Sequence, residues 1–167
     1  MANYRGHIAG GLAAGTLYAV LLSKVPVERY AEAAGLLENW QALAALFVLS
    51  ILFALFPDVD TNSKGQDIFV GIAFVVDVLL ILDGHLQAAA YLGLIAMLPI
   101  IGHHRGWTHS KLAMFIVPLP LLLVPYIHNE NVLPISIVYY GAAVAGYFSH
   151  LLLDGLIWKR IRVKGGR

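Results

Sequence analysis

The chain has 167 residues, of which 59% are hydrophobic and 13% are charged, and its mean hydropathy is +0.75. These values lie outside the range of soluble globular domains and predict a polytopic membrane protein with one domain over residues 1–167. A net charge of +1 without Lys/Arg tracts argues against nucleic acid as a partner. Because the chain has no cysteine, any metal must be held by imidazole and carboxylate groups.

Six apolar stretches predict an all-α bundle of about six transmembrane helices. They cover residues 8–23, 40–56, 68–82, 86–101, 112–127 and 133–158. Several hold only about 15 to 17 residues, fewer than the ~20 that cross a hydrocarbon core of ~30 Å, so their ends must extend into the flanking polar residues. The first stretch lacks a clear cleavage site followed by a polar mature start, and we expect it to remain as a membrane helix rather than a signal peptide.

The links between the stretches carry further predictions. Residues 24–39 mix charged residues with alanine and leucine and predict an interfacial surface helix or loop. The short link at 83–85 favours a tight helical hairpin over a pair of re-entrant half-helices. Pro118, Pro120 and Pro125 predict kinks in the fifth helix.

Basic residues are distributed unevenly between the two sides of such a bundle. With six spans, nine of the eleven Lys and Arg residues share the side of the termini, and only Lys24 and Arg29 fall on the other. The nine are Arg5, Lys64, Arg105, Lys111, Lys159, Arg160, Arg162, Lys164 and Arg167. The positive-inside rule therefore predicts cytoplasmic termini.

The end of the second stretch reads Phe-Pro-Asp-Val-Asp at 56–60. Proline ends a helix, and two carboxylates on a following extended turn, Asp58 and Asp60, can converge on one cation. The alternative is that these aspartates only cap or turn the chain, which the residue type also favours.

A second motif, Gly-His-His-Arg-Gly-Trp-Thr-His-Ser at 102–110, joins the fourth and fifth stretches. His104 and His109 are five residues apart, so they can face each other only if the chain turns near Gly106. Arg105 offers a rigid cationic fork for a phosphate or carboxylate, and Ser110 or Thr108 can cap the fifth helix. The alternative is a loop that anchors helix ends at the lipid headgroups.

The sixth stretch holds the most diagnostic spacing in the chain. His150 and Asp154 are four residues apart, so they share one helical face and can bind one metal or form a self-satisfied pair. His7 opens the first stretch, where Gly10, Gly11 and Gly15 form a small face suited to close helix packing.

The candidate ligands come from four separate stretches yet all fall on or near the predicted cytoplasmic side. They are His7, Asp58, Asp60, His104, His109, His150 and Asp154. Ionisable groups are costly to desolvate near a membrane, so this shared position predicts a metal site. Asp77 lies inside the third stretch, where it would act as an ion relay or as a polar tie between helices. Asp83, His85 and His128 are predicted to lie on the opposite side of the membrane.

These motifs together resemble the YdjM-like family of bacterial and archaeal inner-membrane proteins, described as metal-dependent hydrolases. The resemblance spans nearly the whole chain, and its motif positions carry over to the seven candidate ligands, with Arg105 and Ser110 as accompanying residues. Gly6 departs from the family pattern, in which threonine often precedes the first histidine. The His/Asp pattern also distantly resembles the zinc-dependent phospholipase C and nuclease group.

Seven candidate ligands are more than the three or four that bind one zinc ion. The sequence therefore predicts two ions, zinc or alternatively manganese, bridged by Asp58 or Asp60. Such a site would activate a water, while Arg105, His109 and Asp60 act as catalytic residues. Its place at the cytoplasmic leaflet predicts membrane lipids as partners and a lipid or lipid-linked phosphoester as substrate. A metal or ion transporter and a non-catalytic scaffold are the alternative functions.

Overall fold

The computed structural model describes residues 3–24, 35, 38–60, 64–101 and 107–157. Every regular element among these residues is a helix. The α-helices are α1 (Tyr4–Leu22), α3 (Trp40–Leu55), α4 (Lys64–Leu82), α5 (Leu86–Ile101), α6 (Lys111–Ile116), α7 (Pro120–His128) and α8 (Leu133–Leu153). Two 3-10 helices, η2 (Phe56–Asp60) and η3 (Glu130–Val132), lie between them. The predicted all-α fold is confirmed.

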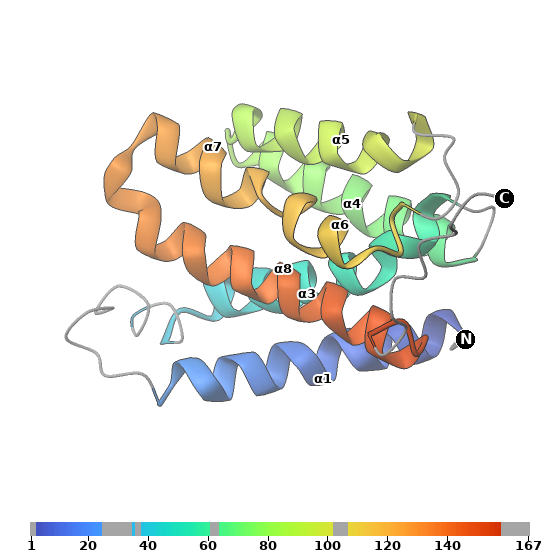
Figure 1. Ribbon diagram of the computed structural model, residues 1–167. Coiled ribbons are helices and arrows are strands. Elements are labelled where there is room, and N and C mark those ends of the chain that lie inside the picture. Colours follow the sequence, from blue (N-terminus) through green and yellow to red (C-terminus); the bar gives the residue numbers. More distant parts are fainter. Residues whose placement is uncertain (1–2, 25–34, 36–37, 61–63, 102–106, 158–167) are drawn as a thin grey trace, which may run out of the picture.

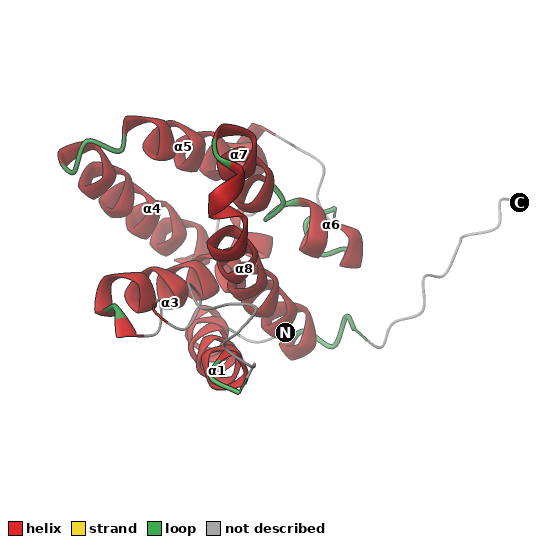
Figure 2. Ribbon diagram, turned by 90° about the vertical axis from the view of Figure 1, so that its left-hand side faces the viewer, coloured by secondary structure: helices red, strands yellow, loops and turns green. Residues whose placement is uncertain are grey.

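Helices α1, α3 and α8 pack against one another and form one half of the bundle. Figure 1 shows them lying along a common direction, with the α4–α5 pair on the far side of α3 and α8 from α1. Figure 2, a view along the bundle, shows α7 between α5 and α8, and α6 on the side of α8 away from α3. The buried core lies where η2, α4, α6 and α8 meet, and includes Phe56, Phe69, Met114 and Tyr147.

Apart from the end of the sixth helix, the helix boundaries lie close to the predicted ones, and several helices begin in the polar flanks as expected. α1 begins at Tyr4 because Asn3 caps it through a hydrogen bond from the Gly6 amide (3.0 Å), and α4 begins at Lys64. α4 and α5 form the predicted hairpin, which turns at Gly84 with a φ of +82°. That positive φ favours glycine.

Two local predictions differ from the structure. Asp58 lies on the 3-10 helix η2 rather than on an extended turn, because Pro57 ends the α-helical hydrogen bonding without ending the helical path. The sixth helix ends at Leu153 rather than at residue 158. There the Leu156 amide donates to the Leu151 carbonyl and Gly155 adopts a φ of +69°, which closes the helix.

The fifth helix is broken, as its prolines predict. α6 and α7 are separated at 117–119, around Pro118, and Pro125 lies inside α7. Ser110 caps α6 by accepting a hydrogen bond from the Ala113 amide (3.0 Å), while Thr108 takes no part in the cap. Most of the predicted surface segment at 24–39 lies outside the described residues.

Four helical segments are long and apolar enough to cross a membrane: Trp40–Val59, Lys64–Leu82, Lys111–His128 and Leu133–Leu153. α5 adds a shorter apolar helix, Leu86–Met97. Large hydrophobic side chains such as Phe74, Leu94 and Leu112 are exposed on the outside of the bundle. Exposed apolar surface on long apolar helices is the pattern of a lipid-facing bundle, so the chain is a helical membrane protein.

Candidate metal centre

Small residues bring the backbones of α1, α3 and α8 close together. The Ser50 hydroxyl on α3 donates to the Gly11 carbonyl on α1 (2.8 Å). Gly146 on α8 lies against the Ser50 backbone, where a Cβ atom would overlap the carbonyl oxygen and lie 2.7 Å from the carbonyl carbon. Such close approach is what glycine and serine allow between membrane helices. The polar ends of the three helices therefore meet.

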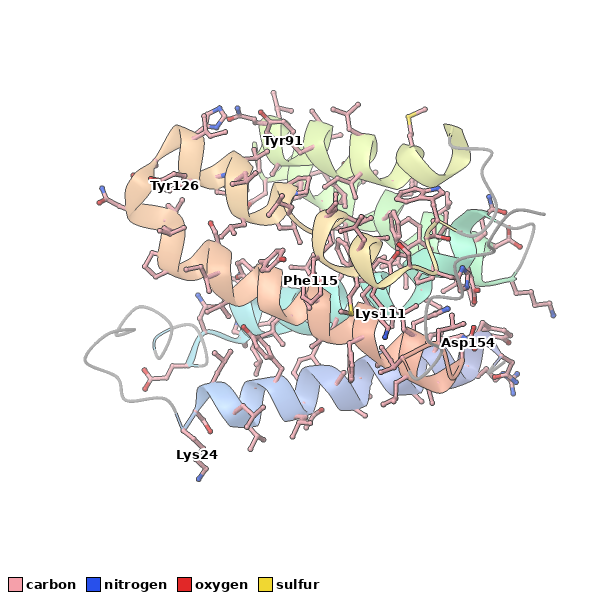
Figure 3. All side chains as sticks on the ribbon, in the orientation of Figure 1. Lys24, Tyr91, Lys111, Phe115, Tyr126 and Asp154 are labelled. Carbon is pink, nitrogen blue, oxygen red and sulfur yellow. The ribbon has the colours of Figure 1, made fainter. Side chains whose placement is uncertain are left out.

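At that meeting point the structure gathers five of the predicted ligands at one end of the bundle. They are His7, Asp58, His109, His150 and Asp154. Figure 3 places Asp154 beside the first turns of α1, at the opposite end of that helix from Lys24. Each of the five lies within about a turn of a helix end or in a link between helices.

Imidazole Nε2 atoms and carboxylate oxygens converge inside this cluster. The separations are 3.8 Å from His7 Nε2 to Asp58 Oδ2, 3.6 Å from His7 Nε2 to Asp154 Oδ1, 3.6 Å from His109 Nε2 to Asp58 Oδ1, 3.8 Å from His150 Nε2 to Asp58 Oδ1 and 3.6 Å from His150 Nε2 to Asp154 Oδ2. His7, His150 and the Asp154 carboxylate are at most 1% exposed, whereas Asp58 is 22% exposed. The cluster is therefore buried, and it is more exposed on the side of Asp58.

His150 is oriented by a main-chain acceptor. Its Nδ1 lies 2.7 Å from the carbonyl oxygen of Ala54, in the last turn of α3, where carbonyls lack helical partners. A carbonyl can only accept, so Nδ1 carries a hydrogen, and in the neutral ring Nε2 keeps its lone pair. That lone pair faces two carboxylate oxygens and makes no hydrogen bond to a described residue. When the ring is neutral and the carboxylates are ionised, these acceptors repel one another, and a cation between them would remove the repulsion.

His7 completes the buried side of the cluster. Its ring stacks on that of His150, with centroids 3.8 Å apart and planes 15° apart, and both Nε2 atoms face the aspartates. His7 Nδ1 is buried without a hydrogen-bond partner among the described residues. The ring of His7 is thus held by packing, whereas that of His150 is also held by a hydrogen bond.

The geometry fits a divalent ion. Ligand atoms at ~2.0–2.1 Å from a tetrahedral zinc ion lie roughly 3.3–3.4 Å apart, a few tenths of an ångström less than the separations in the cluster. Two groups of three residues each offer ligand atoms within 4.8 Å of one another: His7, His150 and Asp154, and Asp58, His109 and His150. The imidazole and carboxylate donors are those that zinc and manganese accept.

A sequence model of the family described as YdjM inner membrane protein matches residues 1–162. The chain belongs to this family. No curated protein and no solved structure shows significant similarity to it. The YdjM match includes every residue of the cluster, and the family description agrees with the apolar helices in assigning the chain to a membrane.

Not every predicted ligand of this YdjM family member can be located. His104 and Arg105 lie outside the described residues, as does the side chain of Asp60. Their predicted roles in the cluster therefore remain predictions from the sequence. The five located ligands come from three motifs and from His7, which the sequence predicted to share one side.

Two residues at the site were not predicted to act there. The Tyr147 hydroxyl on α8 donates to the Thr108 carbonyl, and the Thr108 hydroxyl donates to the Pro57 carbonyl (3.1 Å). Both side chains are fully buried. A signal for Tyr147 existed, because it precedes His150 by three residues and so lies on nearly the same helical face.

Residues predicted on the opposite side are at the other end of the bundle. Asp83 and His85 form an exposed ion pair (3.2 Å) at the α4–α5 turn, and His128 ends α7. Asp77 on α4 borders a cavity of about 200 Å³ between α4 and α5, and its Oδ1 is buried without a hydrogen-bond partner among the described residues. None of the residues that line this cavity belongs to the cluster.

Proposed function

We propose that this membrane protein is a metal-dependent hydrolase whose cluster holds two divalent ions, zinc or alternatively manganese. The observation that carries the proposal is the set of imidazole Nε2 atoms facing carboxylate oxygens at 3.6–3.8 Å in a buried site. With neutral imidazoles and ionised aspartates, these lone pairs would repel one another unless a cation lay between them. Membership of the YdjM family is consistent with this proposal.

The way the carboxylates are shared supports two ions rather than one. Asp58 and Asp154 each present one oxygen to His7 and the other to His150. A carboxylate with its oxygens divided in this way is suited to bridging. The two ions would be held by His7, His109 and His150 together with Asp58 and Asp154. Two-ion sites are common in enzymes that cleave phosphoesters.

When bound, the ions supply a water-derived nucleophile near neutral pH and polarise the group under attack. The chain's own residues hold and orient the reacting groups. The open flank at Asp58 and His109 is where a substrate can enter, because His7 and His150 are buried behind it. Arg105, four residues before His109, would stabilise negative charge that develops on a phosphoryl oxygen, and Asp60 would supply a further carboxylate.

The position of the cluster supports a lipid or lipid-linked phosphoester as substrate. The ligands lie at or near the ends of helices, and a bilayer crossed by the apolar helices would meet water at that level. A phosphoester attached to a lipid is held at this level by its acyl or isoprenoid chain. A soluble metabolite gains nothing from a site placed there.

The test is to purify the protein in detergent, measure its metal by elemental analysis, and assay phospholipids and lipid pyrophosphates in mixed micelles. We expect bound zinc or manganese in the wild type and hydrolysis of at least one substrate. His150→Ala should lose metal, activity and thermal stability together, because metal binding to the folded state contributes to its stability. His128→Ala is the matched control for metal content and activity, because His128 is an exposed histidine at the other end of the bundle.

The outcomes separate the parts of the proposal. Full metal content in His150→Ala would remove His150 from the ligands. A fully metallated wild type that hydrolyses none of these substrates above the His109→Ala background would rule out the phosphoesterase and favour an acyl or amide substrate.

Orientation gives an independent prediction. Arg5, Lys64 and Lys111 begin α1, α4 and α6 at the end of the bundle that holds the cluster, and with the C-terminal basic residues they favour a cytoplasmic position. A reporter that is active only in the cytoplasm should therefore be active when it is fused after Arg167, and a reporter that is active only in the periplasm should be inactive there. Activity of a periplasm-dependent reporter at the same position would place the cluster on the outer leaflet.

A metal or ion transporter is the second candidate, favoured by Asp77. An ionisable residue inside an apolar helix, with a buried oxygen that lacks a partner among the described residues, is a possible stepping site between the membrane faces. Metal that stays bound through purification, with no flux in proteoliposomes, would exclude transport. A scaffold without catalysis would contain no metal and would melt at the same temperature with and without a chelator.

A further inference from the structure

Thr108 joins two of the segments that carry ligands. Its hydroxyl donates to the Pro57 carbonyl (3.1 Å), one residue before Asp58, and lies 3.2 Å from Nδ1 of the adjacent His109. The side chain of Thr108 is fully buried. The position of Asp58 relative to His109 is therefore fixed in part by this one hydroxyl.

The single hydrogen of this hydroxyl favours one tautomer of His109. A threonine hydroxyl has one hydrogen, and a carbonyl oxygen can only accept, so that hydrogen is directed to Pro57. Towards His109 the hydroxyl must then act as an acceptor, and the hydrogen of the neutral imidazole lies on Nδ1. The Nε2 atom, 3.6 Å from Asp58 Oδ1, is left with the lone pair that a metal requires.

Tyr147 fixes Thr108 from the opposite direction. Its hydroxyl, buried in the core beside Phe56, donates to the main-chain carbonyl of Thr108. Tyr147 lies on α8 three residues before His150, so the bond connects the segment of His109 to the helix of His150. Thr108 is thus held through its side chain to η2 and through its main chain to α8, which are the two elements that supply Asp58 and His150.

We propose that Thr108 and Tyr147 are positioning residues for the metal centre. Thr108 sets the tautomer and position of His109, and Tyr147 holds Thr108 against α8. The inference rests on the proposed metal site and adds a prediction of its own, because both hydroxyls donate to main-chain carbonyls and not to a ligand of the cluster. Groups that orient metal-binding histidines in this way are typically worth 10–100-fold in metal affinity.

The experiment measures Co²⁺ binding to the full-length protein in detergent, by competition with a chelator and by the visible absorption of bound Co²⁺. Thr108→Val, which replaces the hydroxyl by a methyl group, should bind Co²⁺ about 10–100-fold more weakly and with a changed spectrum. Thr108→Ser keeps the hydroxyl and should restore both. A role in packing alone would not be rescued by serine, which lacks the threonine methyl group.

Tyr147→Phe provides a second variant if Thr108→Val does not fold. It removes only the hydroxyl and should weaken Co²⁺ binding in the same direction. Tyr140→Phe is the matched control, because Tyr140 lies on the same helix and also donates to a main-chain carbonyl, that of Phe115 (3.2 Å), away from the cluster. Tyr140→Phe should bind Co²⁺ as the wild type does.

The outcomes distinguish this inference from the proposed function. If the wild type binds neither Co²⁺ nor Zn²⁺, the metal site itself is absent. If the wild type binds Co²⁺ and Tyr147→Phe binds it with equal affinity and an unchanged spectrum, the positioning role is overturned while the metal site stands. Weaker binding in Tyr147→Phe, with Tyr140→Phe unchanged, supports it.

Discussion

Asp58→Asn is expected to lose its divalent metal almost completely, with affinity at least about 100-fold weaker than in the wild type. Asp58 is the carboxylate that faces all three histidines of the cluster, with Oδ2 towards His7 and Oδ1 towards His109 and His150. The amide has the same shape but carries no charge and offers one oxygen instead of two. Removing a group that only orients a metal ligand typically weakens metal affinity 10–100-fold. Loss of a ligand that both ions share should therefore weaken it by more than that.

The measurement is elemental analysis of the purified variant together with chelator competition. Asp83→Asn is the matched control, since Asp83 also lies beside a histidine (3.2 Å) but is exposed at the far end of the bundle. It should keep the wild-type metal content. Wild-type metal in Asp58→Asn would mean that Asp58 is not shared between the histidines, and the two-ion arrangement would have to be abandoned.

Much of the fold follows from the sequence because apolar length and proline position act locally. The prolines of the fifth stretch predicted kinks, where the structure has a break between α6 and α7, and the link at 83–85 predicted the hairpin. The end of α8 could not be placed from apolarity, because Leu156 and Ile157 continue the apolar pattern past the glycine turn that closes the helix. The 3-10 geometry at Asp58 likewise depends on packing of η2 against α4 and α8 rather than on Pro57 alone.

The candidate site was predictable to the extent that its spacings are local. His150 and Asp154 meet as their i,i+4 spacing indicates, and Gly11 packs closely as the small face of α1 predicted. The roles of Thr108 and Tyr147 could not be predicted, since their partners lie 51 and 39 residues away in the sequence. Only the tertiary arrangement reveals which carbonyl a buried hydroxyl reaches.

The close packing of three helices is the physical basis of the cluster, and Gly146 is its tightest point. A Cβ atom there would meet backbone atoms of Ser50, including Cα at 2.9 Å, and backbone cannot move aside as a flexible side chain can. Gly146 lies one helical turn before His150. Pushing α8 away from α3 at this point would therefore also move His150 relative to Asp58 and Ala54.

Gly146→Ala is accordingly expected to lower the apparent Tm by roughly 3–10 °C, because overpacking costs about 1–3 kcal/mol, and to weaken metal binding at the same time. Thermal unfolding in detergent and chelator competition measure the two effects. Gly71→Ala is the control, because its Cβ would meet nothing within 4 Å and alanine favours the helix. If Gly146→Ala melted and bound metal as Gly71→Ala does, α3 and α8 would not pack closely enough to hold His150 against the Ala54 carbonyl.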